Sequence, residues 1–131
     1  MKGGKEGDLV AVFREEAEVV ELPGRQWSLL LGPSNVGSRN MTLGLSSFPA
    51  GSAPAGHVHP SEEEMIYVVS GRGQLRAGNA SVSLHPGVAV YIPPGVHHAT
   101  VASEEEPLSL ITAFSPPVVP GSYEKPGPGR S

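Results

Sequence analysis

Short runs of β-branched and aliphatic residues recur along the chain, and glycine or proline separates most of them. Runs of this length and composition are typical of strands, and the glycines and prolines between them are typical of turns. Eight strands are predicted, at residues 25–31, 39–48, 63–70, 73–76, 81–84, 88–92, 98–102 and 108–114. Many short strands at close spacing predict an all-β sandwich or barrel.

The polar and apolar pattern before residue 25 fits two structures. Apolar positions within 9–17 roughly fit one face of a helix, whereas those within 19–22 fit a strand. Of the two, we favour an extended arm. The length of 131 residues is close to the commonest size of one domain. We therefore expect an N-terminal arm at 1–24 that can add a strand, one β domain at 25–114, and a Pro/Gly-rich arm at 115–131.

Two glycine-containing segments predict turns between neighbouring strands. The first, Gly71-Arg72-Gly73, follows the run at 63–70, and the second, Gly78-Asn79, precedes the run at 81–84. Glycine adopts the positive φ that tight hairpin turns require. We therefore expect the strands on either side of each segment to be antiparallel neighbours.

The charge pattern excludes several classes of partner. The formal net charge is -4, acidic residues cluster at 62–64 and 104–106, and basic residues form no stripe, so nucleic acid is not expected as a partner. No apolar run approaches the roughly 20 residues needed to cross a bilayer, so no membrane association is expected. The first residues are polar and do not resemble a secretory signal, which predicts a cytoplasmic protein.

The chain has no cysteine, so any metal site must be built from histidine and carboxylate. His57 and His59 are two residues apart, and extended backbone places both imidazoles on one face. Glu64 shares a strand face with Ile66 and Val68, which suit a barrel interior. A carboxylate buried there without a partner costs several kcal/mol, and a metal ion is a partner that removes this cost.

A further pair of histidines, His97 and His98, follows a Pro-Gly turn. Adjacent residues of a strand point to opposite faces, so only one of the two can face the interior, and the pattern does not decide which. Three aromatic residues are large enough to line a cavity, but we expect each to be buried in an ordinary core: Trp27, Phe48 and Tyr91.

Two segments of the chain resemble the two sequence motifs of the cupin family. The first matching segment runs from Gly51 through His57, His59 and Glu64 to Gly71. The second runs from Gly87 through Pro93 and Gly95 to His98. With the flanking strands the resemblance extends over 25–114. It implies a double-stranded β-helix, the jelly-roll barrel of cupins.

The resemblance also implies a metal site and selects His98 over His97. The implied ligands of one divalent transition metal ion are His57, His59, Glu64 and His98. Three imidazoles and one carboxylate suit Fe, Mn, Ni, Co, Cu or Zn better than Ca or Mg. Four protein ligands leave two positions of an octahedral ion open, as in catalytic sites. Ala102 replaces the usual asparagine of the motif, which puts a polar contact near the site in doubt but not a ligand.

Two classes of function follow from the resemblance. The first is a metal-dependent enzyme of dioxygenase, isomerase, decarboxylase or lyase type that acts on a small metabolite, with a slight preference for dioxygenase from the habits of the family. Tyr91 and His97 are then candidates for proton transfer. The alternative is a non-catalytic module that binds a small molecule or sugar. Small cupins commonly pair, and strand-like segments such as 19–31 can cross to a partner, so we expect a homodimer.

Overall fold

The computed structural model describes residues 3–118, which form mainly β-strands with two short helical turns. All strand pairs among the described residues are antiparallel. In chain order the elements are β1 (Gly4–Glu6), β2 (Leu9–Ala11), the 3-10 turn η1 (Arg14–Glu16), β3 (Glu18–Leu22), β4 (Arg25–Leu31), α1 (Pro33–Val36), β5 (Thr42–Phe48), β6 (Glu63–Ser70), β7 (Gly73–Ala77), β8 (Ala80–Leu84), β9 (Ala89–Ile92), β10 (Ala99–Ala102) and β11 (Leu108–Ser115). The eight predicted strands are confirmed, with ends shifted by at most three residues.

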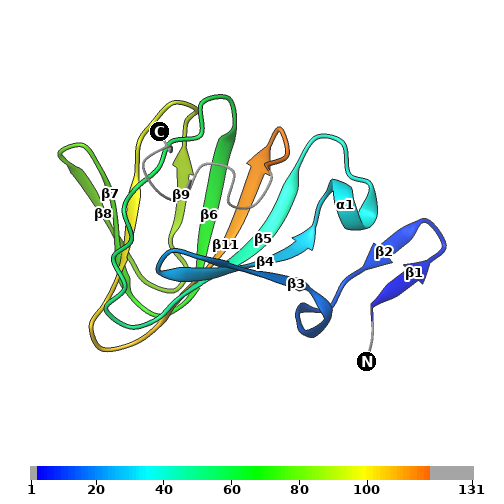
Figure 1. Cartoon of the computed structure of the whole chain (residues 1–131), viewed down its shortest axis with the longest axis horizontal. Coiled ribbons are helices and arrows are strands. Elements are labelled where there is room, and N and C mark those ends of the chain that lie inside the picture. The colour runs from blue at the N-terminus through cyan, green and yellow to red at the C-terminus, as the bar shows by residue number, and fades with distance from the viewer. Residues whose placement is uncertain (1–2, 119–131) are drawn as a thin grey trace.

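Two sheets enclose the main core (Figure 1). The larger has the strand order β3-β4-β5-β11-β6-β9, and the smaller has the order β10-β7-β8. Both sheets contribute to one buried apolar cluster, formed by Phe48, Ile66, Val68, Leu75, Leu84, Ile92, Ala102, Leu108 and Leu110. Burial of each large aliphatic side chain stabilises the fold by about 1.5–3 kcal/mol, so this cluster holds the two sheets together.

The prediction of a hairpin at Gly71-Arg72-Gly73 is wrong. The strands on either side, β6 and β7, lie in different sheets, and β6 pairs with β11 and β9 instead. Gly71 lies where the chain passes from one sheet to the other, and the backbone of Pro107 is close to it there. A Cβ on Gly71 would lie 1.9 Å from the carbonyl oxygen of Pro107. Glycine suits this position for two reasons: it leaves room for the neighbouring backbone, and it adopts the positive φ of 86° that the chain has here. The second predicted hairpin, at Gly78-Asn79, is confirmed between β7 and β8.

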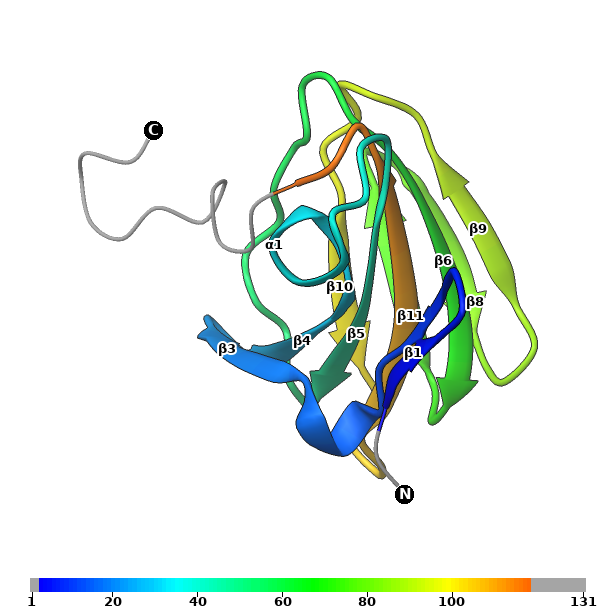
Figure 2. The same ribbon diagram turned by 90° about the vertical axis from the view of Figure 1, so that its right-hand side faces the viewer.

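The N-terminal segment is extended apart from η1, as favoured from the sequence. The strand β3 pairs with β4 and forms one edge of the six-stranded sheet. The two-stranded β1–β2 sheet projects beyond α1 from that side of the molecule (Figures 1 and 2). None of the helices in 3–118 is long and apolar enough to span a membrane.

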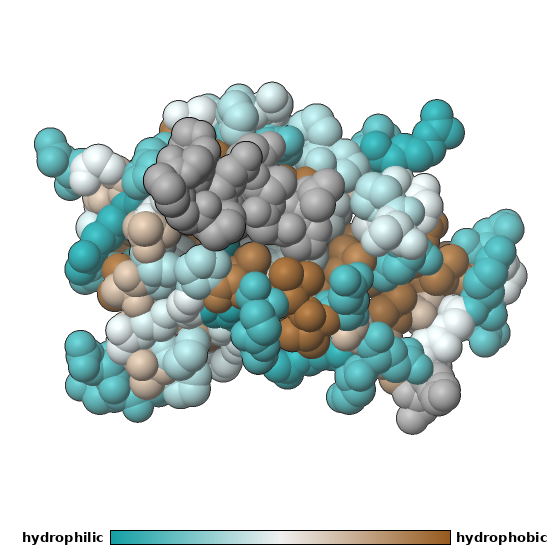
Figure 3. All heavy atoms as spheres, viewed as in Figure 1, coloured by the Kyte–Doolittle hydropathy of each residue, from teal (hydrophilic) through white to brown (hydrophobic). Residues whose placement is uncertain are grey.

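A second apolar cluster lies at the β3–β4 side of the barrel. It consists of Trp27, Leu29, Phe114 and Val118, with Leu22 packed against it. Apolar side chains also gather in the middle of the face seen in Figure 3, over β3 and β4. Val118 belongs to the predicted C-terminal arm at 115–131, so the start of this arm packs on the barrel. The rest of the arm, at 119–131, lies outside the described residues.

Candidate metal centre

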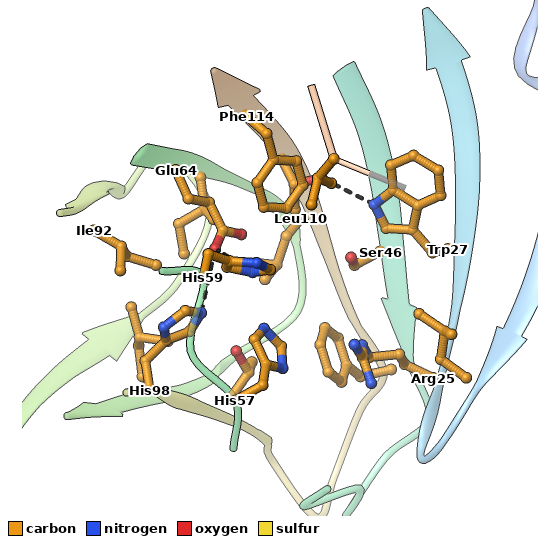
Figure 4. Close-up of a pocket in the computed structure, with 17 residues that line it drawn as sticks. Arg25, Trp27, Ser46, His57, His59, Glu64, Ile92, His98, Leu110 and Phe114 are labelled. Carbon is orange, nitrogen blue, oxygen red and sulfur yellow. Dashed lines mark hydrogen bonds and ion pairs between the residues drawn. The ribbon is translucent and has the colours of Figure 1, made fainter. Parts of the chain in front are cut away.

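Four side chains from the two motifs converge in the interior of the barrel: His57, His59, Glu64 and His98 (Figure 4). Each offers one nitrogen or oxygen ligand atom, and these four atoms lie within 4.8 Å of one another. His59, Glu64 and His98 are buried, and His57 is partly buried. This is the ligand set implied by the sequence, brought together from positions up to 41 residues apart (98 − 57).

Backbone hydrogen bonds clamp the two histidine-bearing segments against each other. The His57 amide donates to the His98 carbonyl at 2.9 Å, and the His98 amide donates back to the His57 carbonyl at 3.0 Å. The Gly95 amide donates to the His59 carbonyl at 2.8 Å. These bonds satisfy buried backbone groups and fix the spacing of the imidazoles. The ring centroids of His57 and His98 are 4.7 Å apart.

Gly56 allows this close approach of the two segments. A Cβ at this position would lie 2.5 Å from the His98 carbonyl oxygen and 2.6 Å from the His97 ring. Separations this short do not occur for real Cβ atoms. A side chain on Gly56 would therefore push the first histidine pair away from His98.

Glu64 lies on the inner face of β6. Exposed and buried residues alternate along this strand, so Glu64, Ile66 and Val68 point inward while Met65 and Tyr67 point outward, as predicted. Only 6% of Glu64 is exposed. The strand thus places a carboxylate in a largely apolar interior, where the charge needs a cationic partner.

The carboxylate of Glu64 lies directly against two imidazoles. Its Oε1 atom is 3.2 Å from His98 Nε2 and 3.6 Å from His59 Nε2. On the other side of its ring, His98 Nδ1 donates to the Val96 carbonyl at 3.0 Å. A carbonyl only accepts, so Nδ1 carries a proton and Nε2 is the ring nitrogen that faces the carboxylate. Nε2 and the carboxylate oxygen are suitably placed to share a metal cation, and the bond to Val96 orients the ring for it.

The four side chains lie at one side of a cavity with an internal volume of about 60 Å³. Aliphatic side chains form part of the wall, and the other described residues around the cavity are aromatic, hydroxyl-bearing or cationic: Trp27, Phe48, Phe114, Ser46, Thr100, Thr112 and Arg25. A space of this size suits a small ligand. Trp27 is fixed in the wall because its Nε1 donates to Thr112 Oγ1 at 3.1 Å.

Arg25 is a charged residue of this cavity that sequence reasoning missed, as it missed Phe114 and the hydroxyl-bearing residues. It begins β4, and it shares the inward face of this strand with Trp27 and Leu29. Alternation in a strand offered a signal, because an arginine in register with two large apolar residues must face the same interior. Figure 4 shows Arg25 entering from the β4 side and pointing toward His57.

The two residues considered for proton transfer do not line this cavity. His97 is exposed and packs near Gly56 on the outside. Tyr91 is 51% exposed, so the expectation that it is buried is wrong. Trp27 and Phe48 are buried, each 4% exposed, but both line the cavity as well as packing in the apolar clusters. The Tyr91 hydroxyl donates to Glu63 Oε1 at 2.7 Å. Mainly because of this hydrogen bond, with smaller effects from desolvation and the Glu63 charge, the pKa of Tyr91 is raised above its ordinary value.

Ala102 lies inside the barrel, four residues after His98 and on the same face of the chain. It is 2% exposed and belongs to the main apolar cluster. It does not line the cavity beside the four candidate ligands. Where the family motif usually has a polar asparagine, this chain therefore has a small apolar side chain that packs in the core.

Comparison with known proteins gives relatives by sequence and by structure. A family model described as a cupin domain matches residues 44–114. An uncharacterised protein of Streptomyces coelicolor is 35% identical over 79 residues, which cover 60% of this chain and 73% of the relative. An RmlC-like cupin from Shewanella frigidimarina superposes with a TM-score of 0.69 at 23% identity, covering 88% of this chain and 95% of that chain. The polyketide cyclase RemF from Streptomyces resistomycificus gives a TM-score of 0.69 at 22% identity, with coverages of 79% and 77%. The structural matches confirm the jelly-roll barrel.

Proposed function

Because the chain belongs to the cupin family, we propose that it is a metal-dependent enzyme that acts on a small metabolite. Members of the family bind small-molecule substrates. One observation carries the proposal: three imidazoles and a buried carboxylate converge at the side of a cavity that has space for a small ligand. A site built only for structure would leave no such space beside the ligands.

In this proposal His57, His59, Glu64 and His98 hold one divalent transition metal ion, drawn from Fe, Mn, Ni, Co, Cu and Zn. When bound, the ion supplies Lewis acidity toward a substrate oxygen, or a redox centre. The aromatic wall of Trp27, Phe48 and Phe114 keeps bulk water from the bound substrate and contacts its carbon skeleton.

Only the residues that line the cavity limit which of the reactions known in the family this chain could carry out. Tyr91 and His97 are outside it, so among residues 3–118 the cavity is lined by no imidazole other than the candidate ligands and by no phenol. The hydroxyls of Ser46, Thr100 and Thr112 line the same cavity and could orient a polar substrate. These residues are compatible with dioxygenase, isomerase, decarboxylase and lyase reactions alike, so an experiment has to distinguish the four.

The same observation supports a second candidate function, a non-catalytic binding module. A barrel that captures a small molecule needs the cavity and the metal but no proton-transfer group. The structural neighbour that is a polyketide cyclase favours the enzyme, which we therefore put first.

Metal analysis and a substrate screen test the proposal. Protein purified without added metal is analysed for metal content and then screened with small metabolites under air and under nitrogen. The enzyme predicts about one metal per chain together with turnover. Turnover only under air identifies a dioxygenase, whereas equal turnover under nitrogen identifies an isomerase, decarboxylase or lyase. Metal with ligand binding but no turnover supports the binding module, and protein without metal refutes both.

We also propose that the protein forms a homodimer. The segment 19–31 pairs with strands of its own chain, so strand exchange is not needed to cover it. What supports pairing is the outer face of the large sheet, where Met65, Tyr67 and Val69 are each about half exposed. Sedimentation that finds a monomer at micromolar concentration would refute the dimer.

Two further expectations from the sequence stay predictions. They are the division into arms at 1–24 and 115–131 around one domain at 25–114, and the cytoplasmic location.

A further inference from the structure

The indole of Trp27 reaches across one strand of the large sheet to contact the next. Trp27 lies on the inner face of β4, and its Nε1 donates to Thr112 Oγ1 on β11 at 3.1 Å, with β5 between these two strands. Gly44 of β5 pairs with Thr112 and makes room for the ring, since a Cβ at Gly44 would lie 2.2 Å from Trp27 Cζ2. The indole and the threonine hydroxyl are therefore held in place at the wall of the cavity.

The hydroxyl of Thr112 can make a further hydrogen bond after it has accepted one from Trp27. A hydroxyl group has one O–H donor and two lone pairs, and the indole uses one of the lone pairs. Among residues 3–118 no acceptor takes the O–H of Thr112, although this side chain is only 3% exposed. A buried donor without a partner is costly. Because Thr112 lines the cavity, an oxygen atom in the cavity is the partner that this O–H can reach, from water before a ligand binds and from the ligand afterwards.

Ser46 adds a second hydroxyl to the same wall. It lies on β5 two residues after Gly44 and pairs with Leu110, so it is a diagonal neighbour of Thr112. Diagonal neighbours on one face of a sheet have Cα atoms about 7–8 Å apart, so one oxygen atom between the two hydroxyls can contact both. Within the described part of the chain Ser46 Oγ also makes no hydrogen bond. Figure 4 shows Trp27 and Ser46 on one side of the cavity and the histidines on the other.

We propose that Ser46 and Thr112 bind a neutral oxygen of the substrate, so that the substrate class is a small metabolite with a hydroxyl or carbonyl group at the end away from the metal. This inference rests on the proposed function, because the other end of the substrate has to reach the four candidate ligands. Both hydroxyls are neutral donors, which suit an uncharged oxygen, whereas a carboxylate would lose more hydration than they return. The contact does not involve Arg25, whose guanidinium donates to the Pro23 carbonyl.

The test compares two thiols of nearly equal size, 2-mercaptoethanol and 1-propanethiol, on the zinc-loaded protein. Thiolate sulfur is a good zinc ligand, so both thiols are anchored at the metal and differ only in a hydroxyl or methyl group at the other end. NMR at the indole N–H of Trp27, the only tryptophan of the chain, gives the Kd of each thiol. Thr112→Val keeps the shape of the side chain and removes the hydroxyl. The variant should bind 2-mercaptoethanol about three- to tenfold more weakly, whereas the Kd of 1-propanethiol should not rise.

Three further variants show whether the effect belongs to the cavity hydroxyls. Thr42→Val is the matched control, because it makes the same change on β5 at a hydroxyl that is 1% exposed but does not line the cavity. It should leave both Kd values unchanged. Thr112→Ser keeps the hydroxyl and should keep the ratio of the two Kd values found in the wild type. Ser46→Ala leaves the bond between Trp27 and Thr112 intact and should weaken the binding of 2-mercaptoethanol alone.

The outcomes separate this inference from the proposed function. If Thr112→Val weakens both thiols by the same factor, or changes the ratio of their Kd values by less than about threefold, the inference is wrong and the zinc site stands. If Thr112→Val weakens mercaptoacetate, which has a carboxylate at that end, more than 2-mercaptoethanol, the neutral class is wrong. Should Thr112→Val not fold, Ser46→Ala decides by the same criteria. If the wild type takes up no zinc, the proposed function fails and this inference fails with it.

Discussion

Replacement of Glu64 by glutamine isolates the one formal negative charge among the four candidate ligands. The side chain is 6% exposed and lies 3.2 Å from His98 Nε2, so glutamine fits the same space but offers a neutral amide. A metal ion that binds only the folded state stabilises it by about 2.7 kcal/mol at a free concentration one hundred times its Kd. For a chain of this size that is a rise in Tm of roughly 8–13 °C.

If the substitution weakens metal binding by about one hundredfold, the same metal concentration contributes only about 0.4 kcal/mol, or a rise of roughly 1–2 °C. The order of stability should reverse in chelator, because the variant no longer buries an uncompensated carboxylate. The assay is a thermal melt with and without chelator, together with metal content. Glu63→Gln makes the same chemical change one residue away at an exposed position, and it should behave as the wild type. Equal metal content and equal shifts for Glu64→Gln and wild type would refute the assignment of Glu64 as a ligand.

Three further substitutions test how the barrel supports the site. Gly56→Ala brings a Cβ to 2.5 Å from a carbonyl oxygen of the second motif and should lower metal content, measured by elemental analysis, whereas Gly4→Ala, where a Cβ has open space, should not. Gly44→Ala places a Cβ 2.2 Å from the Trp27 ring and should lower stability by about 1–3 kcal/mol with a change in tryptophan fluorescence; an unchanged melt would contradict this packing. Tyr91→Phe should leave metal content and the chelation-induced shift in Tm unchanged, because the phenol is outside the cavity, and a loss of metal would place it in the site.

The strands could be predicted from the sequence because their signal is local. Alternation along 63–70 placed Glu64 on the buried face of β6, and the structure has it there. The choice between His97 and His98 needed the resemblance to cupins, since alternation shows only that two neighbours face opposite ways. The structure then places His98 inside and His97 outside.

Local sequence patterns could not predict which distant strands pair with each other. The glycines at 71 and 73 signalled a change of direction, but nothing in the pattern showed that β6 pairs with β11, some 40 residues later, instead of with β7. Arg25 was missed for a related reason. Its register with Trp27 along β4 shows only that Arg25 faces inward. That it lies at the same cavity as the histidines depends on the pairing of β4 with β5 in the large sheet.

The central claim is that His57, His59, Glu64 and His98 together hold one divalent metal ion. A crystal of the protein loaded with zinc, with anomalous diffraction recorded on both sides of the zinc edge, tests it most directly. We expect one strong anomalous peak inside the barrel, bonded to one imidazole nitrogen from each of the three histidines and to the Glu64 carboxylate, with at least one remaining position facing the cavity. A barrel with no anomalous peak at these four side chains, or with a peak that Glu64 does not touch, would contradict the account.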